Sequence, residues 1–140
     1  MTTSGPQQEE APRFLAVGHC GPDGWMLRTA IQRSWPDATV ESIGDEADLE
    51  ALLAADSTGP AVLLVNRQLD GRFEAADGID LIRNRHEPGS DRVWVLISNF
   101  EDAQSEAIAA GAHPGFGKTA LNNPDTTAVL ESAVARSQGH

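Results

Sequence analysis

Polar side chains with chemical potential follow short apolar runs at several places in this sequence. They are Gly18 to Cys20, Asn66 to Gln68, Ser98 and Asn99, and Lys118. The clearest case is Asn66, which directly follows five apolar residues at 61–65 and opens a polar loop. A carboxylate at such a place can act as a nucleophile or bind a metal, whereas a neutral amide is a far weaker nucleophile and offers hydrogen bonds instead. The sequence therefore predicts a polar pocket in which an amide stands where much chemistry needs an acid.

The apolar runs themselves predict the strands that position this pocket. Those at 14–17, 61–65 and 93–97 lack polar alternation, which is typical of parallel strands covered on both faces. The segment 38–43 alternates more and indicates a less buried strand, and 113–118 indicates a short irregular one.

Helical patterns with recognisable ends separate these strands. Asp23 can cap a first helix that Pro36 ends, and Asp45 opens a second. The further expected ends are Asp77 with Asp80 for a third helix, Asn99 and Gly111 for a fourth, and Asn123 with Pro124 for a fifth.

Five strands alternating with five helices predict a doubly wound five-stranded parallel sheet in a three-layer α/β sandwich with right-handed crossovers. In such folds the site forms outside the carboxyl ends of the strands, where the strand order reverses. The length of 140 residues fits one domain, expected over 13–137. Residues 1–12 are too polar to bury and predict a flexible tail.

Composition narrows the classes of partner. The formal net charge is −11, from 21 acidic and 10 basic residues, which disfavours binding to nucleic acid or to an anionic membrane. Basic residues cluster only at Arg83, Arg85 and His86, as expected at a helix end. No apolar stretch is long enough for a bilayer span, the N-terminus lacks the features of a secretion signal, and the lone Cys20 excludes an internal disulfide. A cytoplasmic location is therefore expected.

Over residues 13–136 the chain resembles the receiver domain of bacterial two-component response regulators. The resemblance is carried by "DGIDLIRNR" at 77–85, by "VWVLIS" at 93–98 and by "EAIAAGAHPGFGK" at 106–118. It implies a flavodoxin-like fold and a role in phosphorelay signal transduction. It also implies that Ser98 and Lys118 correspond to the hydroxyl residue and the lysine of the family's phosphorylation site.

Other positions depart from the family pattern. The acidic pair that holds Mg²⁺ corresponds to Gly18 and His19, and the aspartate that accepts phosphate corresponds to Asn66. The aromatic switch position corresponds to Gly115, although Phe116 is adjacent.

Two smaller differences lie beside the site. Thr119 replaces the proline that usually follows the lysine, and the loop after Asn66 is longer than usual. That loop is either a contact surface or a tolerated insertion.

The nucleophile and the metal ligands are thus missing together. We expect a degenerate phosphoacceptor pocket of Gly18, His19, Asn66, Ser98 and Lys118, with no catalytic residue, metal or cofactor. Within it the Asn66 amide is expected to bond the Lys118 ammonium and the Ser98 hydroxyl. Such a cluster either only satisfies buried polar groups or fixes the loops as a constant binding face.

The favoured hypothesis is a stand-alone atypical receiver, or pseudo-receiver, that is not an enzyme and acts by protein–protein interaction. Its partner would be a histidine kinase, another regulator or a further signalling protein, and a homodimer is possible. Trp25, if exposed, is a candidate anchor. One alternative is a phosphorelay receiver that accepts phosphate at Asp70 or Asp77, and another is a small ligand-binding module.

Overall fold

The fold alternates strands and helices throughout, as expected. The computed structural model describes residues 12–55 and 59–138, so the predicted tail lies outside this part except for Pro12, whose carbonyl accepts a hydrogen bond from Thr39. The strands are β1 Arg13–Val17, β2 Thr39–Ile43, β3 Ala61–Asn66, β4 Arg92–Ile97 and β5 His113–Phe116. The helices are α1 Gly21–Ser34, α2 Glu46–Ala54, α3 Gly78–Arg85, α4 Glu101–Ala109 and α5 Pro124–Ser137, with a short 3-10 helix η3 at Lys118–Ala120.

The strands form one parallel sheet in the order β2-β1-β3-β4-β5. The chain moves outward from β1 to β2, returns to β3 on the other side of β1, and then continues to β4 and β5. The strand order therefore reverses between β1 and β3, which places the ends of these two strands at the crevice where such folds bind ligands. The predicted doubly wound, flavodoxin-like architecture is confirmed.

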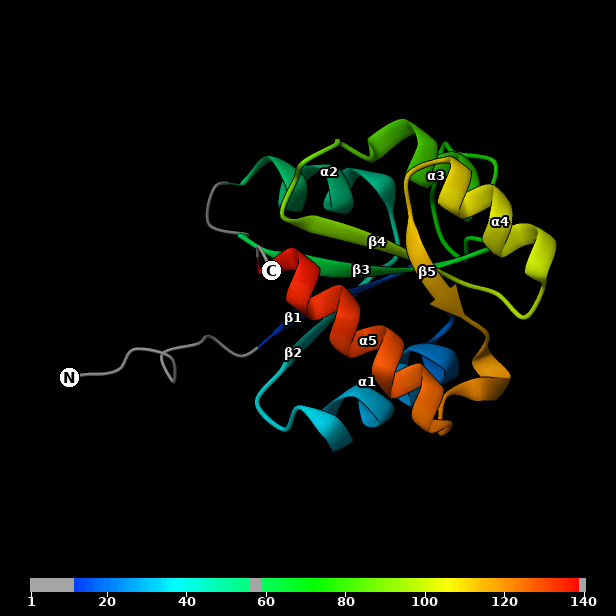
Figure 1. The fold of residues 1–140 in the computed structure, drawn as a ribbon. Coiled ribbons are helices and arrows are strands. Elements are labelled where there is room, and N and C mark those ends of the chain that lie inside the picture. Colours follow the sequence, from blue (N-terminus) through cyan, green and yellow to red (C-terminus); the bar gives the residue numbers. More distant parts are fainter. Residues whose placement is uncertain (1–11, 56–58, 139–140) are drawn as a thin grey trace.

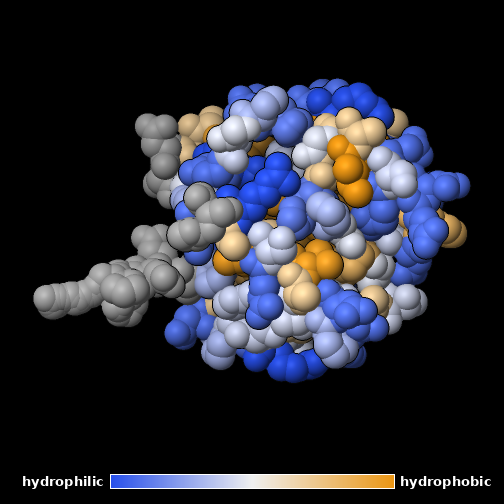
Figure 2. Space-filling view, in the orientation of Figure 1, coloured by the Kyte–Doolittle hydropathy of each residue, from blue (hydrophilic) through white to orange (hydrophobic). Residues whose placement is uncertain are grey.

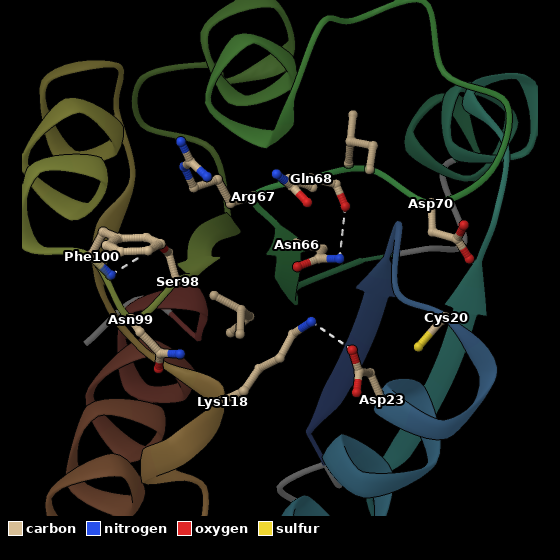
Figure 3. Close-up of a pocket in the computed structure, with 12 residues that line it drawn as sticks. Cys20, Asp23, Asn66, Arg67, Gln68, Asp70, Ser98, Asn99, Phe100 and Lys118 are labelled. Atoms are coloured by element: carbon tan, nitrogen blue, oxygen red, sulfur yellow. Dashed lines mark hydrogen bonds and ion pairs between the residues drawn. The ribbon is translucent and has the colours of Figure 1, made fainter.

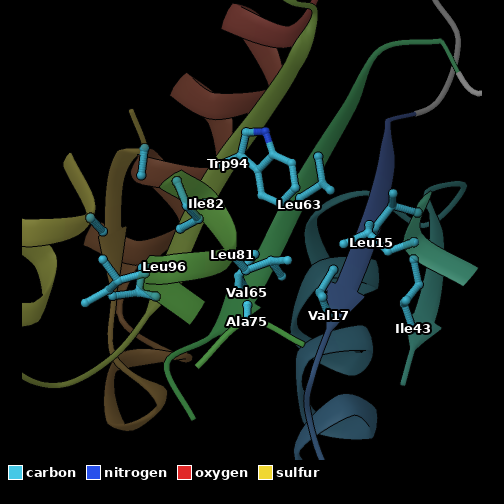
Figure 4. Packing of buried hydrophobic residues seen from close by; sticks show 14 of the residues in the cluster. Leu15, Val17, Ile43, Leu63, Val65, Ala75, Leu81, Ile82, Trp94 and Leu96 are labelled. Atoms are coloured by element: carbon cyan, nitrogen blue, oxygen red, sulfur yellow. The ribbon is translucent and has the colours of Figure 1, made fainter. Parts of the chain in front are cut away.

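Helices cover both faces of the sheet, with α2, α3 and α4 on one side and α1 and α5 on the other (Figure 1). Successive strand residues face opposite sides, so each strand supplies both cores. Leu15 and Leu63 pack with Leu81 and Ile82 of α3 on one face (Figure 4). Phe14 and Leu64 pack with α1 and α5 on the other. Burial on both faces explains why the strand segments are almost continuously apolar.

Most of the predicted helix ends are confirmed. Asp45, Asp77 and Asn123 each accept a bond from the backbone N–H two or three residues on. α1 instead begins at Gly21, so the prediction that Asp23 caps it is wrong, and Asp23 lies within the first turn. α4 begins after Phe100, and Asn99 is not its cap.

The fifth strand was predicted over 113–118, but β5 ends at Phe116 and Lys118 belongs to η3. Over residues 12–55 and 59–138, no helix combines the length and the apolar character that a bilayer crossing requires.

Candidate functional site

A cavity of about 480 Å³ opens at the carboxyl ends of the strands (Figure 3). It is lined by Cys20, Asp23, Asn66, Arg67, Gln68, Leu69, Asp70, Ile97, Ser98, Asn99, Phe100 and Lys118. Three of the five predicted pocket residues, Asn66, Ser98 and Lys118, therefore meet there. Gly18 and His19 lie at the end of β1 but do not line the cavity.

Asn66 uses both hydrogens of its side-chain amide on the backbone. Its Nδ2 donates to the carbonyl oxygen of Gly18 at 3.1 Å and to that of Gln68 at 2.7 Å. Since both partners are carbonyl oxygens, only the NH₂ group of the amide can face them. An ionised carboxylate is acceptor-only and makes neither bond. The amide at this position is therefore a hydrogen-bond donor that ties the end of β3 to the end of β1.

Gly18 occupies a conformation that excludes the acidic side chain of the family pattern. Its φ is +75°, and a Cβ atom there would lie 2.6 Å from Cδ2 of Leu69. Its carbonyl also accepts a bond from the backbone N–H of Asp70 at 2.9 Å. Leu69 thus fills the space next to Gly18, and an acid at this position needs both a different backbone and a displaced loop.

The loop that supplies Leu69, residues 67–77, is folded against the sheet edge. Gly71 lies so close to the carbonyl of Gly44 that a Cβ would meet it at 2.1 Å, and the backbone N–H of Arg72 donates to that same carbonyl at 2.9 Å. Leu69 and Phe73 pack against the core on the α3 side. The longer loop is consequently a built part of the pocket wall.

His19 follows β1, and its ring is hydrogen-bonded to the backbone of β3. Its Nε2–H donates to the carbonyl of Leu64 at 2.9 Å, and its Nδ1 is buried without a hydrogen-bond partner. Burial, partly offset by the bond to Leu64, lowers its pKa to about 4. The imidazole is therefore neutral near pH 7.

Lys118 pairs with Asp23 and not with the amide, which corrects the sequence-based expectation. The Nζ–Oδ2 distance is 2.6 Å, and both side chains are about one-third exposed. The hydrogen bond from Lys118 holds the pKa of Asp23 below its usual value, and a bond from Cys20 acts in the same direction. Ser98 is also engaged elsewhere, because its Oγ accepts from the backbone N–H of Phe100 at 3.2 Å.

Sequence reasoning overlooked Asp23 because a helix cap was a sufficient explanation for it. Its place in the first turn of the helix that follows β1 was the available signal, since that turn lies at the same sheet edge as Lys118.

The two alternative carboxylates differ in position. Asp70 lines the cavity, together with Arg67, whose guanidinium lies 5.6 Å from the ring centroid of Phe100. Asp77 does not line it, and its Oδ1 accepts from the backbone N–H of Asp80 at 2.9 Å as the cap of α3. Within the ranges that the structure describes, no three His, Cys, Asp or Glu side chains are grouped to hold a metal ion.

The end of β5 has no exposed aromatic side chain at Gly115 or Phe116. A Cβ at Gly115 would meet the carbonyl of Leu96 at 2.1 Å, so no side chain fits at the family's aromatic position. A bulge between β4 and β5 shifts the register, and Phe116 is 7% exposed within the α1–α5 core. Gln104, which sequence reasoning missed, donates to Leu96 and accepts from the backbone N–H of Gly115.

Comparison with solved structures places this architecture among receiver domains. The signal receiver domain of an HD domain-containing protein from Pseudomonas fluorescens Pf-5 superimposes with a TM-score of 0.72 and 16% identity, covering 94% of this chain and all of that one. A response regulator from Thermotoga maritima superimposes with a TM-score of 0.68 and 17% identity, covering 89% of this chain and 98% of that one. The signal receiver domain of a DNA-binding response regulator from Colwellia psychrerythraea 34H superimposes with a TM-score of 0.61 and 18% identity. This match covers 86% of this chain and 98% of that one.

No protein-family model matches the sequence, and no curated protein matches it either. The chain therefore has the fold of response-regulator receiver domains, and at these identities the likeness concerns the fold alone. What its own pocket does has to be argued from the residues present.

Proposed function

We propose that this chain is an atypical, non-enzymatic receiver of a bacterial signalling pathway that acts in the cytoplasm by binding a protein, without phosphorylation at residue 66. Receiver-type signal transduction agrees with the structural neighbours. The partner is a histidine kinase, another regulator or a related signalling protein, contacted by a surface whose conformation does not depend on phosphate.

One observation carries the proposal. Asn66 donates to two backbone carbonyls in the place where a receiver needs a nucleophilic carboxylate. Leu69 fills the space that a side chain at residue 18 would need, and Lys118 already has an anionic partner in Asp23. The carboxylate nucleophile is therefore absent and the lysine is engaged, and the same contacts connect β1 to β3 and η3 to α1.

An exposed apolar pair on α1 is a suitable contact surface. Trp25 is 66% exposed and Met26 is 46% exposed, so two adjacent large apolar side chains lie on the surface of α1. They stand in the same first turns as Asp23, whose bond to Lys118 joins α1 to η3. Large exposed aromatic and methionine side chains are the types that anchor protein interfaces.

The test compares partner capture by three forms of the protein from a lysate of the source bacterium. Trp25→Ser should remove the captured protein that the parent retains. Ile108→Ser, at an apolar residue of α4 that is as exposed as Met26, should leave it bound. Adding acetyl phosphate and Mg²⁺ should not change the amount captured by the parent. Capture that rises or falls with acetyl phosphate would contradict a phosphate-independent role.

A second candidate function retains the phosphorelay, with Asp70 as the acceptor. It is favoured by the position of Asp70 in the same cavity as Lys118 and Arg67. It predicts a Mg²⁺-dependent phosphoryl adduct that Asp70→Asn abolishes. A ligand-binding module, in contrast, would show a thermal shift with one member of a nucleotide and metabolite panel and no adduct.

A further inference from the structure

A second cavity, of about 360 Å³, lies away from the receiver pocket, among the end of α4, the start of β5, the end of α5 and the segment that joins α3 to β4. Figure 2 looks onto this face and shows strongly hydrophilic side chains beside the C-terminal end of α5. Four cationic or titratable side chains line the cavity, namely His86, Arg92, His113 and Arg136, against a single acidic residue, Glu87. Such a concentration stands out in a chain with a formal net charge of −11.

Among the residues that the structure describes, the two arginines of this cluster lack the carboxylate partners that other cations have. Over residues 12–55 and 59–138, neither Arg92 nor Arg136 forms an ion pair, whereas Arg85 and Lys118 do. Arg92 Nη1 donates to the carbonyl of Leu53 at 2.7 Å, and its Nε is buried without a partner.

His113 faces the second arginine. Its Nδ1 lies 3.4 Å from Nη1 of Arg136, so the ring accepts from the guanidinium and carries its own hydrogen on Nε2. Burial, and then the positive charge of Arg136, lower the pKa of His113.

The cavity wall is held in place by close packing. The ring of His86 lies where a side chain at Gly111 would be, 2.1 Å from the position of a Cβ, and Gly111 has a φ of +118°. Ser90 Oγ accepts from the backbone N–H of Arg92 at 3.1 Å, which leaves its hydroxyl hydrogen for another acceptor. Apolar side chains of Trp94 and Ile108 line the remaining wall.

We propose that this cavity binds a small anion whose phosphate or carboxylate group lies between Arg136, His113 and Arg92. Guanidinium groups bind both kinds of oxyanion by charge-assisted hydrogen bonds, with Ser90 as a further donor. The apolar wall suits a ligand with a short carbon skeleton. This site is independent of the receiver pocket, because its lining shares no residue with that cavity.

The test titrates the intact protein with inorganic phosphate and, separately, with acetate, and follows the amide signals of Ser90 and His113 by NMR. At least one probe should give saturable shifts at these residues. Arg136→Gln changes an exposed side chain and should weaken binding about tenfold or more, as expected for loss of a hydrogen bond between charged groups. Arg33→Gln, at an arginine of α1 that bonds Asn122, is the matched control and should bind as the parent does.

Phosphate alone, or acetate alone, would identify the ligand class. Shifts that do not saturate with either probe would overturn the proposal. So would equal weakening by Arg33→Gln, because that result indicates general attraction of anions to any arginine. His113→Gln provides a second variant, which should also weaken binding while unfolding as cooperatively as the parent.

Discussion

Replacing Asn66 by aspartate should destabilise the protein, although aspartate is the residue that receivers carry at this position. The two bonds from Nδ2 to the carbonyls of Gly18 and Gln68 would be lost. Each such bond contributes about 1 kcal/mol net. A carboxylate facing two carbonyl oxygens adds repulsion, so the free energy of unfolding should fall by about 2–4 kcal/mol near pH 7.

Asn99→Asp is the matched control, since Asn99 lines the same cavity. Its Oδ1 accepts from the backbone N–H and the hydroxyl of Thr119, and a carboxylate preserves both of these bonds. This variant should stay within about 0.5 kcal/mol of the parent.

The assay is urea unfolding followed by tryptophan fluorescence, with stability compared at equal slope. A protonated acid can donate one of the lost bonds, so the deficit of Asn66→Asp should shrink in acid. The reasoning is refuted if Asn66→Asp is as stable as Asn99→Asp or more stable than the parent.

Three further predictions concern the residues around Asn66. Gly18→Ala should lower the free energy of unfolding by about 1–3 kcal/mol, because the φ of residue 18 is +75° and a Cβ there would collide with Leu69. Adding Leu69→Ala should not restore all of this loss. A full rescue in thermal unfolding would show that the backbone is unstrained. The pKa of His19 is lowered from 6.5 to about 4 in the folded protein, so the unfolded chain binds the proton more readily. The free energy of unfolding should therefore decrease as the pH falls from about 6.5 to 4, by up to about 3 kcal/mol. His19→Gln keeps a donor for Leu64 and should flatten the stability profile over that pH range, whereas an unchanged profile would assign the acid sensitivity to other groups. Asp23→Asn should cost about 1 kcal/mol or less, because the pair with Lys118 is partly exposed, and the loss should diminish in high salt; a double-mutant cycle with Lys118→Met that gives no coupling energy would show that the pair does not stabilise the fold.

The fold was predictable because the apolar runs and the caps agree with one another. The runs that became β3 and β4 are apolar on both faces, which is typical of a covered parallel sheet, and Asp45 and Asp77 cap the helices as their spacing predicted. The cap at Asp23 was wrong because helix propensity does not distinguish a cap from a first-turn residue that faces a neighbouring element.

The members of the cavity were predictable only in part, since Gly18 and His19 do not line it, and the bonds among its side chains were not predictable. The sequence placed Asn66, Ser98 and Lys118 at one sheet edge, and the cavity brings them together. Their partners depend on the path of the loop at 67–77 and on the turn of α1, which local patterns do not specify. The basic cavity was even less predictable from the sequence. His86 looked like part of a helix end, and only the folding of β4, β5 and α5 brings Arg92, His113 and Arg136 into the same cavity.

The central claim is that the hydrogen-bonded amide at the tip of β3 has replaced phosphate chemistry in this pocket. Its most direct test is the intact mass of the unmodified protein after incubation with acetyl phosphate and Mg²⁺, with a phosphorylatable receiver treated in parallel. The account predicts that the receiver gains one phosphoryl group and that the mass of this protein does not change. A labile, Mg²⁺-dependent phosphoryl adduct on Asp70, or on any other carboxylate lining the pocket, would contradict it.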